Sequence, residues 1–421
     1  MKSLIQFPFQ MPLTSLLSIL VLLGVTSASL QADWTEFRGS AAQGVVDIEL
    51  PRTWSPSQNI TWRTELPGSG WSSPIVVGDS IFLTSAIEAG DAGYQLSLLK
   101  VDAKSGKLTD PIMIFQQPKD SPRIHQKNSH ASPTPVFDGR HLYIHFGHLG
   151  SACCDLNGNV LWKNESLQYA PVHGGGGSPQ LTDRLMIFTR DGGNIAKVTA
   201  LDKRTGSIAW ETARESNADK TFSFCTPLMI DAAGRKQLIV PGSNVVQSLD
   251  PATGKELWRV TYSGFSVVPR PVFESGLVFI ATGFMQASLL AIDPSGLGDV
   301  TESHVRWTVK NGVPETPSFV AKQGRLMMVS DKGVVSCLEA NSGRELWKKR
   351  VGGNFSSSLL LAKELLYAFD ELGVCTVLDV SKSEPEVVSK NDLKERTLAS
   401  PSVVGNDLLV RTSAALYRIS K

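Results

Sequence analysis

Histidine is the residue type whose distribution along this chain first suggests chemistry. Six of the seven histidines fall in one window, and histidine is both the commonest metal ligand and the usual proton carrier near neutral pH. His145 and His148 stand three apart on or after an expected strand, where an extended backbone points them to opposite faces. The spacing therefore favours polar residues around a channel mouth over a metal site. The six are His125, His130, His141, His145, His148 and His173.

Other polar residues accompany these histidines just before expected innermost strands. His125 and His130 precede one such strand, and His173 precedes the next. Arg270 and Glu315 hold corresponding places further along. If these strands surround one channel, the segments meet at the same end of it and can form a ligand site; the alternative is that they solvate a water-filled mouth. The predicted ligand-binding residues are His125, Lys127, Asn128, His130, His173, Arg270 and Glu315.

Several motifs with well-defined chemistry are lacking. The glycine run 174–177 has no following Lys-Ser or Lys-Thr and no helix, which disfavours nucleotide binding. Asp155 to Asn159 superficially resembles a calcium loop, but an Asn-Gly hairpin turn explains it. No Gly-x-Ser-x-Gly elbow or kinase catalytic loop is present. No catalytic residue and no metal ligand can be assigned from these patterns.

The neighbouring pair Cys153-Cys154 has two interpretations. Aligning the turn after Cys154 with the turn after Leu338 places Cys153 level with Cys337, so a cysteine recurs at one strand position. Such recurrence favours small apolar packing over redox chemistry. A disulfide between neighbours also requires a strained peptide. Five cysteines in a chain of this length do not form a disulfide framework.

A repeat positions all of these residues. Its unit is a small residue and proline, two strands, a third strand ending in Leu-Asp, a Thr-Gly turn, and a fourth strand ending in Trp, with a period of roughly 40 to 60 residues. About eight units predict an all-β, eight-bladed β-propeller of four-stranded antiparallel blades. The unit openings are Ser73-Pro74, Thr134-Pro135, Ser178-Pro179, Thr226-Pro227, Arg270-Pro271, Thr316-Pro317, Ser357-Ser358 and Ser400-Pro401.

Tryptophan recurs once in most units. A large ring at a fixed position fills the wedge between adjacent sheets, so we interpret these residues as blade-docking core rather than ligand contacts. The last unit stops before its tryptophan strand, and residues 59–63 supply a matching segment at the other end of the chain. We therefore expect this N-terminal strand to complete the last blade and close the ring. The docking tryptophans are Trp62, Trp162, Trp210, Trp258, Trp307 and Trp347.

The segment from Leu249 to Trp258, Leu-Asp-x-x-Thr-Gly-x-x-x-Trp, resembles the tryptophan-docking repeat of pyrroloquinoline-quinone (PQQ) enzymes. Together with Trp34-Thr35-Glu36-Phe37-Arg38-Gly39, it resembles the exported PQQ-like propellers of planctomycetes. The repeat is also similar to that of the propeller lipoprotein of the outer-membrane β-barrel assembly machinery. The resemblance implies fold more than chemistry, because catalysts and scaffolds share this repeat. In PQQ dehydrogenases it would imply PQQ with calcium, and in several a vicinal disulfide against the cofactor.

The N-terminus has the pattern of a secretory signal. Lys2 precedes an apolar run from Leu13 to Val25 and small residues for cleavage, so we assign residues 1–28 to a signal peptide and 29–421 to a single propeller domain. The protein is then periplasmic or extracellular, with no transmembrane segment after cleavage. The formal net charge of the full chain is +1, which argues against nucleic-acid binding. We expect a monomer.

Three function classes follow. The first is a binding or scaffold module for a protein, glycan or small-molecule ligand. The second is an oxidoreductase in which PQQ and calcium oxidise an alcohol or sugar. The third is a glycan hydrolase, although spacing singles out no carboxylate pair. The sequence favours the first.

Overall fold

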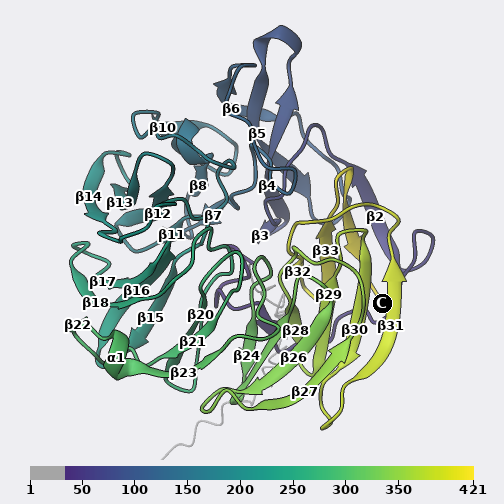
Figure 1. Ribbon diagram of the computed structural model, residues 1–421. Coiled ribbons are helices and arrows are strands. Elements are labelled where there is room, and N and C mark those ends of the chain that lie inside the picture. Colours follow the sequence, from purple (N-terminus) through teal and green to yellow (C-terminus); the bar gives the residue numbers. More distant parts are fainter. Residues whose placement is uncertain (1–33) are drawn as a thin grey trace, which may run out of the picture. The chain divides into compact units, whose positions relative to one another are not determined.

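The chain from Trp34 onward folds into a closed ring of β-sheets. The computed structural model describes residues 34–421, which form one compact unit. The expected signal peptide lies outside the described residues. Eight sheets surround a central channel (Figure 1). The prediction of an eight-bladed, all-β propeller is confirmed.

Each sheet runs from the channel to the rim. The strands of the first four blades, innermost first, are β3 (Ile75–Val77), β4 (Ser80–Glu88), β5 (Tyr94–Asp102) and β6 (Ile112–Gln117); β7 (Val136–Phe137), β8 (Leu142–His145), β9 (Ser151–Cys154) and β10 (Val160–Asn164); β11 (Gln180–Leu181), β12 (Leu185–Asp191), β13 (Ala196–Asp202) and β14 (Ile208–Ala213); and β15 (Leu228–Ala232), β16 (Arg235–Gly242), β17 (Val245–Leu249) and β18 (Glu256–Thr261).

The second half repeats this order. Its strands are β19 (Val272–Glu274), β20 (Leu277–Ala281), β21 (Leu289–Ile292) and β23 (Val305–Val309); β24 (Val320–Lys322), β25 (Arg325–Val329), β26 (Val334–Glu339) and β27 (Glu345–Arg350); β28 (Leu360–Ala362), β29 (Leu365–Phe369), β30 (Val374–Asp379) and β31 (Glu386–Asp392); and β32 (Ser402–Val404), β33 (Asp407–Arg411), β34 (Ala415–Ile419) and β2 (Ile60–Glu65).

Two blades gain a short fifth strand that the repeat did not predict. β1 (Val45–Val46) pairs in parallel with the innermost strand β28, because the N-terminal segment runs inside the channel. β22 (Gly298–Asp299) pairs in parallel with the outermost strand β18 and covers its edge. The helical elements of residues 34–421 are three single turns, η1 (Gly90–Ala92), η2 (Gly147–Leu149) and α1 (Thr301–His304).

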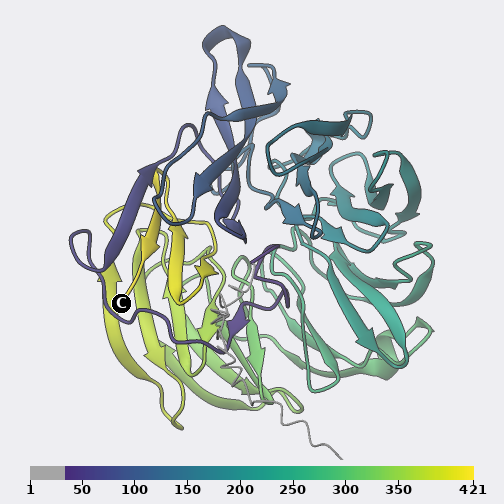
Figure 2. The same ribbon diagram turned by 180° about the vertical axis from the view of Figure 1, so that it is seen from behind.

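The ring is closed by the N-terminal strand, as expected. β2 pairs antiparallel with β34, with Trp62 opposite Arg418 and Glu65 opposite Ala415. Figure 2 shows this strand, in purple, at the outer side of the yellow C-terminal blade. Pairing the two chain ends within one sheet gives the last blade its fourth strand, so the eight sheets join without a gap.

The tryptophans of four blades lie against a glycine turn of the following blade. A Cβ on Gly206 would stand 2.5 Å from the Trp162 ring, and φ at Gly206 is +71°, so glycine is required both for space and for backbone conformation. The Trp162 Nε1 donates to Lys203 O at 2.8 Å. The four pairs are Trp62 with Gly106, Trp162 with Gly206, Trp210 with Gly254, and Trp307 with Gly343.

The remaining two tryptophans pack differently. Trp258 is fully buried and its Nε1 donates to Gln237 Oε1 within its own blade at 2.7 Å. Trp347 is buried in the cluster between the sixth and seventh blades. In the first blade, Ile112 occupies the place of a tryptophan, since its side chain meets Gly158 of the second. The seventh blade has Ser389 at the position that Trp347 takes in the sixth, so a bulky apolar side chain is frequent at the blade contacts but not universal.

We predict that Trp62→Ala destabilises the whole ring, because it removes the docking contact at the blade that closes it. Truncating a half-buried tryptophan here should cost about 2 to 4 kcal/mol of unfolding free energy. Glu65→Ala on the same strand is the control, since the Glu65 side chain is largely exposed. Chemical denaturation monitored by circular dichroism measures both. Equal midpoints for the two variants would contradict a closing role for Trp62.

Candidate functional site

A belt of hydroxyl side chains joins neighbouring blades around the channel. The Oγ1 of Thr134 accepts from Ser73 N, and the Oγ of Ser178 accepts from Thr134 N, both at 2.9 Å. The same bond recurs at the Thr226, Ser318, Ser358 and Ser400 hydroxyls. Each residue stands two positions before an innermost strand. The small residue that opens most repeat units is therefore explained by its hydroxyl, which accepts a hydrogen bond from the neighbouring blade. The belt residues are Thr134, Ser178, Thr226, Ser318, Ser358 and Ser400.

The belt corrects the predicted register of the sixth blade. The sequence pointed to Thr316-Pro317, but the belt position is Ser318, two residues later, because β24 begins at Val320. Arg270 stands at the belt position of the fifth blade, where a hydroxyl residue would be expected. We call the channel end at which the innermost strands begin the mouth face, and the opposite end the far face.

The N-terminal segment fills the channel below the belt. Trp34 pairs antiparallel with Val76 of β3, so the chain enters from the far face and runs toward the mouth. It turns at Arg38 and Gly39, which both have positive φ, and returns along β28 as β1. We call residues 34–46 the plug. Figure 2 shows it as a purple loop inside the ring. Its Phe37 lines the pocket above, so the plug forms the floor of that pocket.

Arg270 holds the plug in place and does not face the mouth. Its side chain is fully buried. Nη1 donates to Phe37 O at 2.6 Å, and Nη2 donates to Glu36 Oε2 at 3.0 Å and to Gln180 Oε1 at 2.6 Å. Nε donates to Pro227 O at 3.1 Å. One guanidinium therefore connects the plug to the third and fourth blades.

The plug carries two further buried charges. Burial raises the pKa of Glu36 although Arg270 opposes that shift. Burial, together with the nearby Arg270 charge, lowers the pKa of Arg38 to about 9. Arg38 Nη2 donates to Phe319 O, from the sixth blade, and to Gln43 O. The plug is thus fixed to the channel wall by polar contacts as well as by packing.

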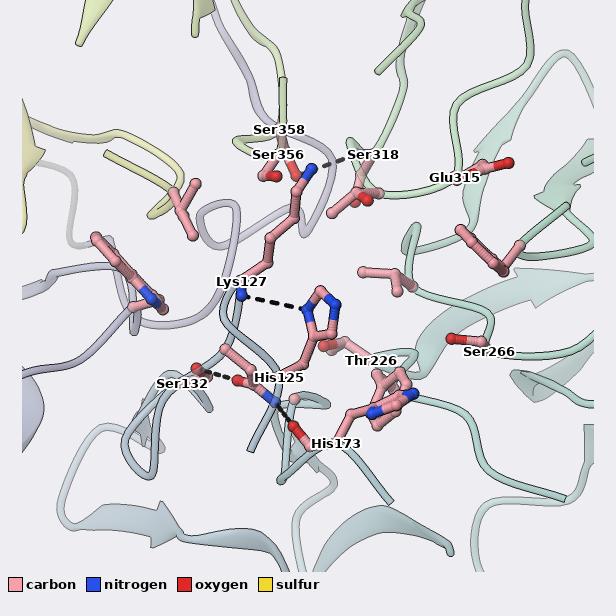
Figure 3. Close-up of a pocket in the computed structure, with 18 of the residues that line it drawn as sticks. His125, Lys127, Ser132, His173, Thr226, Ser266, Glu315, Ser318, Ser356 and Ser358 are labelled. Atoms are coloured by element: carbon pink, nitrogen blue, oxygen red, sulfur yellow. Dashed lines mark hydrogen bonds between the residues drawn. The ribbon is translucent and has the colours of Figure 1, made fainter. Parts of the chain in front are cut away.

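A pocket of about 730 Å³ opens above the plug on the mouth face (Figure 3). The hydroxyl belt and Phe37 line its base. Of the predicted ligand-site residues, five line this pocket: His125, Lys127, Asn128, His173 and Glu315. The other two do not: Arg270 is buried below, and His130 packs against Tyr94 with 4.9 Å between ring centroids.

The connection between the first two blades crosses the pocket. His125 N donates to His173 O at 3.2 Å, and Asn128 Nδ2 donates to the same carbonyl at 2.8 Å. Lys127 reaches the seventh blade, where its Nζ lies 2.6 Å from Glu371 Oε1. Figure 3 shows the lysine extending toward Ser356 and Ser358. We call residues 125–128 the strap, because they bridge opposite sides of the mouth.

The remaining histidines are structural in placement. His145 is buried on β8, where its Nδ1 lies 2.9 Å from Ser151 Oγ and burial lowers its pKa to about 3. Burial also lowers the pKa of His148 to about 4. His141 follows the turn at Asp138, whose carboxylate accepts from the His141 backbone N–H. Among residues 34–421, no three His, Cys, Asp or Glu side chains are grouped to hold a metal ion.

The pocket has an aromatic side that the sequence did not reveal. Phe222 and Phe224 precede the fourth blade, Phe265 precedes the fifth, and Phe284 lies on the β20–β21 loop. Neighbouring centroids are 5.2 Å (His173 to Phe222), 5.8 Å (Phe222 to Phe265) and 6.1 Å (Phe265 to Phe284) apart. We call His173, Phe222, Phe224, Phe265 and Phe284 the aromatic wall. They come from three connections and one loop, so only the propeller topology brings them together.

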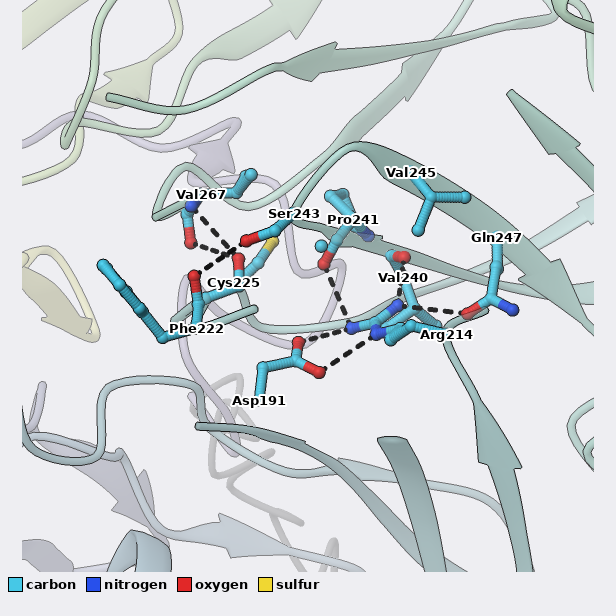
Figure 4. Close-up of polar contacts among 12 residues, drawn as sticks. Asp191, Arg214, Phe222, Cys225, Val240, Pro241, Ser243, Val245, Gln247 and Val267 are labelled. Carbon is cyan, nitrogen blue, oxygen red and sulfur yellow. Dashed lines mark hydrogen bonds and ion pairs between the residues drawn. The ribbon is translucent and has the colours of Figure 1, made fainter. Parts of the chain in front are cut away.

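A buried ion pair supports the wall from behind (Figure 4). Arg214 Nε and Nη2 donate to the two carboxylate oxygens of Asp191 at 3.1 and 2.7 Å, and both side chains are almost fully buried. The guanidinium also donates to the carbonyls of Val240 and Pro241. These hydrogen bonds connect the third blade to the fourth, next to the segment that carries Phe222. They also provide acceptors for the buried guanidinium.

The cysteines lie apart from the pocket. All five are buried and none forms a disulfide. Cys153 stands opposite Trp162 in the β9–β10 pairing, and Cys337 stands opposite Trp347. Ala200 and Ser248 take the corresponding position opposite Trp210 and Trp258 in two other blades. A small residue thus stands opposite the tryptophan in these blades, and cysteine meets that requirement; the closing blade differs, with Arg418 opposite Trp62.

The polar groups of the pocket do not match a PQQ-calcium site. The carboxylates that line it are Glu315 and Asp331, and each already accepts a backbone bond, from Met285 N and Glu315 N respectively. Asn128 Oδ1 accepts from Ser129 N and Ser132 Oγ. A Glu, Asn and Asp set for calcium is therefore not assembled. Cys153 and Cys154 are also outside the pocket lining, so no vicinal disulfide could face a cofactor there.

Sequence and structure comparisons agree with this architecture. The family model described as "Outer membrane protein assembly factor BamB" matches residues 53–294 and 299–420. The chain belongs to this BamB family. The BamB of Moranella endobia is 24% identical over 274 residues, which is 60% of this chain and 65% of that relative. The chain thus spans slightly less than two thirds of that relative's length.

Solved structures show the same fold at low identity. The BamB of Moraxella catarrhalis aligns with 86% of this chain and 99% of its own, at a TM-score of 0.58 and 14% identity. A europium-containing methanol dehydrogenase covers 93% of this chain and 98% of its own, at a TM-score of 0.66 and 10% identity. Proteins named as an assembly factor and as an enzyme thus share this fold. These structural similarities establish the architecture, and the function has to be argued from the pocket.

We predict that Arg270→Met releases the plug. The change leaves the Glu36 carboxylate buried without its cation, which costs about 3 to 5 kcal/mol when one partner of a buried pair is removed. Limited proteolysis within residues 34–46 should accelerate, and the melting temperature should fall. Arg306→Met is the matched control, since Arg306 forms an exposed pair with Asp293 and should change little. Equal protease resistance of the two variants would show that Arg270 does not fix the plug.

Proposed function

We propose that this protein is an exported binding scaffold that receives its partner at the mouth face. The observation that carries the proposal is the plug: it blocks the channel below the belt, so the 730 Å³ pocket has its base inside the ring and its opening on the mouth face. Polar and aromatic side chains from several blades converge there. Two curated relatives that match are each named an outer membrane protein assembly factor, which fits a binding module rather than a catalyst.

The quinoprotein alternative has less support. It needs calcium ligands and a flat cofactor site, and the carboxylates and amide of this pocket are already engaged by backbone and hydroxyl donors. The hydrolase alternative needs two carboxyl groups with different roles. Burial and the neighbouring Asp331 raise the pKa of Glu315, but Asp331 accepts a hydrogen bond from the Glu315 backbone and is engaged by that contact.

Export rests on the N-terminal sequence. Lys2, the apolar run and the small residues that follow form a signal pattern. The chain has no helix within residues 34–421 with the length and hydropathy needed to cross a membrane. The proposal of export therefore rests on the sequence of residues 1–28.

We expect N-terminal sequencing of protein from the exported fraction to begin just after Ala28 or Ala32. Replacing the apolar run 13–25 with serine-rich sequence should leave the protein in the cytoplasm. Protein that retains Met1 and fractionates with the cytoplasm would contradict export.

The mouth face can be tested by site-directed photo-cross-linking in cells. Leu372 lies on the β29–β30 loop, at the mouth face, and Leu297 follows β21, at the far face; their exposed fractions are 72% and 69%. We predict discrete cross-linked adducts from p-benzoylphenylalanine at position 372 and few from position 297. The two positions start from the same residue and the same exposure, so they differ in face alone. Adducts of equal yield from both would refute a mouth-face function.

A further inference from the structure

The aromatic wall presents apolar surface where a folded protein usually hides it. Phe284 is 47% exposed and Met285 is 67% exposed, side by side on the β20–β21 loop. They separate the main pocket from a smaller hollow of about 270 Å³, and both residues line both cavities. Adjacent exposed apolar side chains at a pocket rim mark a contact site.

The backbone holds this loop in an unusual conformation. Gly283, Met285 and Gln286 have φ values of +107°, +55° and +70°. Phe284 N donates to Phe265 O at 2.8 Å, and Met285 N donates to Glu315 Oε1 at 3.1 Å. Left-handed backbone at non-glycine residues is costly and persists where surrounding contacts enforce it. The exposed tip is therefore fixed rather than loose.

Hydrogen bonds align the rest of the wall. Phe222 O accepts from Ser266 N at 3.1 Å and from Ser243 Oγ at 2.9 Å. Phe224 N donates to Val267 O at 2.8 Å. The rings thus keep their places without a ligand, which lowers the entropic cost of binding one.

The ring geometry distinguishes between ligand classes. Successive rings from His173 to Phe284 meet at 82°, 82° and 75°, so no two neighbours share a plane. A sugar chain would need flat faces in a common orientation to stack along the row. The rings pack edge to face on one another and leave the outer surface of Phe284 and Met285 exposed, and phenylalanine and methionine are enriched at the centres of protein interfaces.

Two carboxylates stand at the end of the wall. Glu315 accepts from the Met285 backbone, and Asp331 accepts from the Glu315 backbone at 2.7 Å. No residue from 34 to 421 forms an ion pair with either, although Lys127 and Lys332 oppose the rise in the pKa of Glu315. Glu371, also at the mouth, is paired with Lys127. Lys220 lies over the Phe265 ring, 4.2 Å from its centre. Two carboxylates without an ion pair therefore lie beside the exposed apolar tip.

We propose that the aromatic wall binds a protein segment that carries an aromatic or large aliphatic side chain next to a lysine or arginine. The apolar side chain packs on the exposed surface of Phe284 and Met285, and the cation lies against Glu315 and Asp331. This deepens the proposed function by naming the partner chemistry and rests on it.

The test begins with a phage-displayed library of random linear peptides, selected on the purified mature protein. Enriched peptides should combine an aromatic or large aliphatic residue with an adjacent Lys or Arg. Their affinity, measured by fluorescence anisotropy, should fall roughly tenfold or more in the double variant Phe284→Ser, Met285→Ser. The double variant Glu315→Gln, Asp331→Asn should weaken binding and flatten its dependence on salt. The far-face variant Leu297→Ser should bind as the unmodified protein does.

The variants should fold, because the replaced apolar side chains are exposed, and melting temperatures check this. Lack of enrichment, or peptides that bind every variant equally, overturns the proposal. Saturable binding of chito- or cello-oligosaccharides that is lost in Phe284→Ser, Met285→Ser also overturns it, in favour of a glycan. Photo-cross-linking at position 372 distinguishes failure of the proposed function from failure of this inference. If adducts persist at position 372 while the wall variants bind the peptides as the unmodified protein does, the mouth face binds a partner but the aromatic wall does not.

Discussion

One buried guanidinium group anchors the loop that turns the channel of this propeller into a pocket. Arg270 occupies the place of a belt hydroxyl, and it uses its donors to hold a loop of the chain that lies more than two hundred positions earlier in the sequence. The bonds to Gln180 and Pro227 fix the guanidinium to two other blades. Without the loop, the innermost strands would surround water. With it, they surround a base on which a ligand can rest.

Two kinds of contact thus stabilise the molecule. The first is repeated and local: each belt hydroxyl accepts from the neighbouring blade, and four tryptophans dock on a glycine turn. Such contacts add up blade by blade, as in other repeat proteins. The second occurs once, at the plug, and depends on buried charge. Buried ion pairs add little net stability over apolar packing, but breaking one is costly, so they specify one arrangement strongly.

The difference between the repeated contacts and the single contact at the plug explains which features could be predicted from the sequence. Trp162, its turn glycine and its cross-strand Cys153 recur at a fixed spacing, so the blade number, the closing strand and the packing of the cysteines could be derived from the pattern. The pocket could be derived in part, because connections before innermost strands must meet at one end. Arg270 was assigned to the right segment, but spacing does not show whether a side chain points to the mouth or to the plug. Phe265 and Phe284 gave no signal, since isolated phenylalanines in loops look alike until the ring brings them together.

The plug enters and leaves through the far face, and this has a practical meaning for handling the protein. The last strand, β34, also runs toward the far face, where Lys421 pairs with Glu49 just beyond the returning plug. Both ends of the propeller are therefore tethered on the side away from the pocket. A chip, bead or fusion partner joined through Lys421 would be attached at the far face. The pocket on the mouth face would then remain accessible to solution.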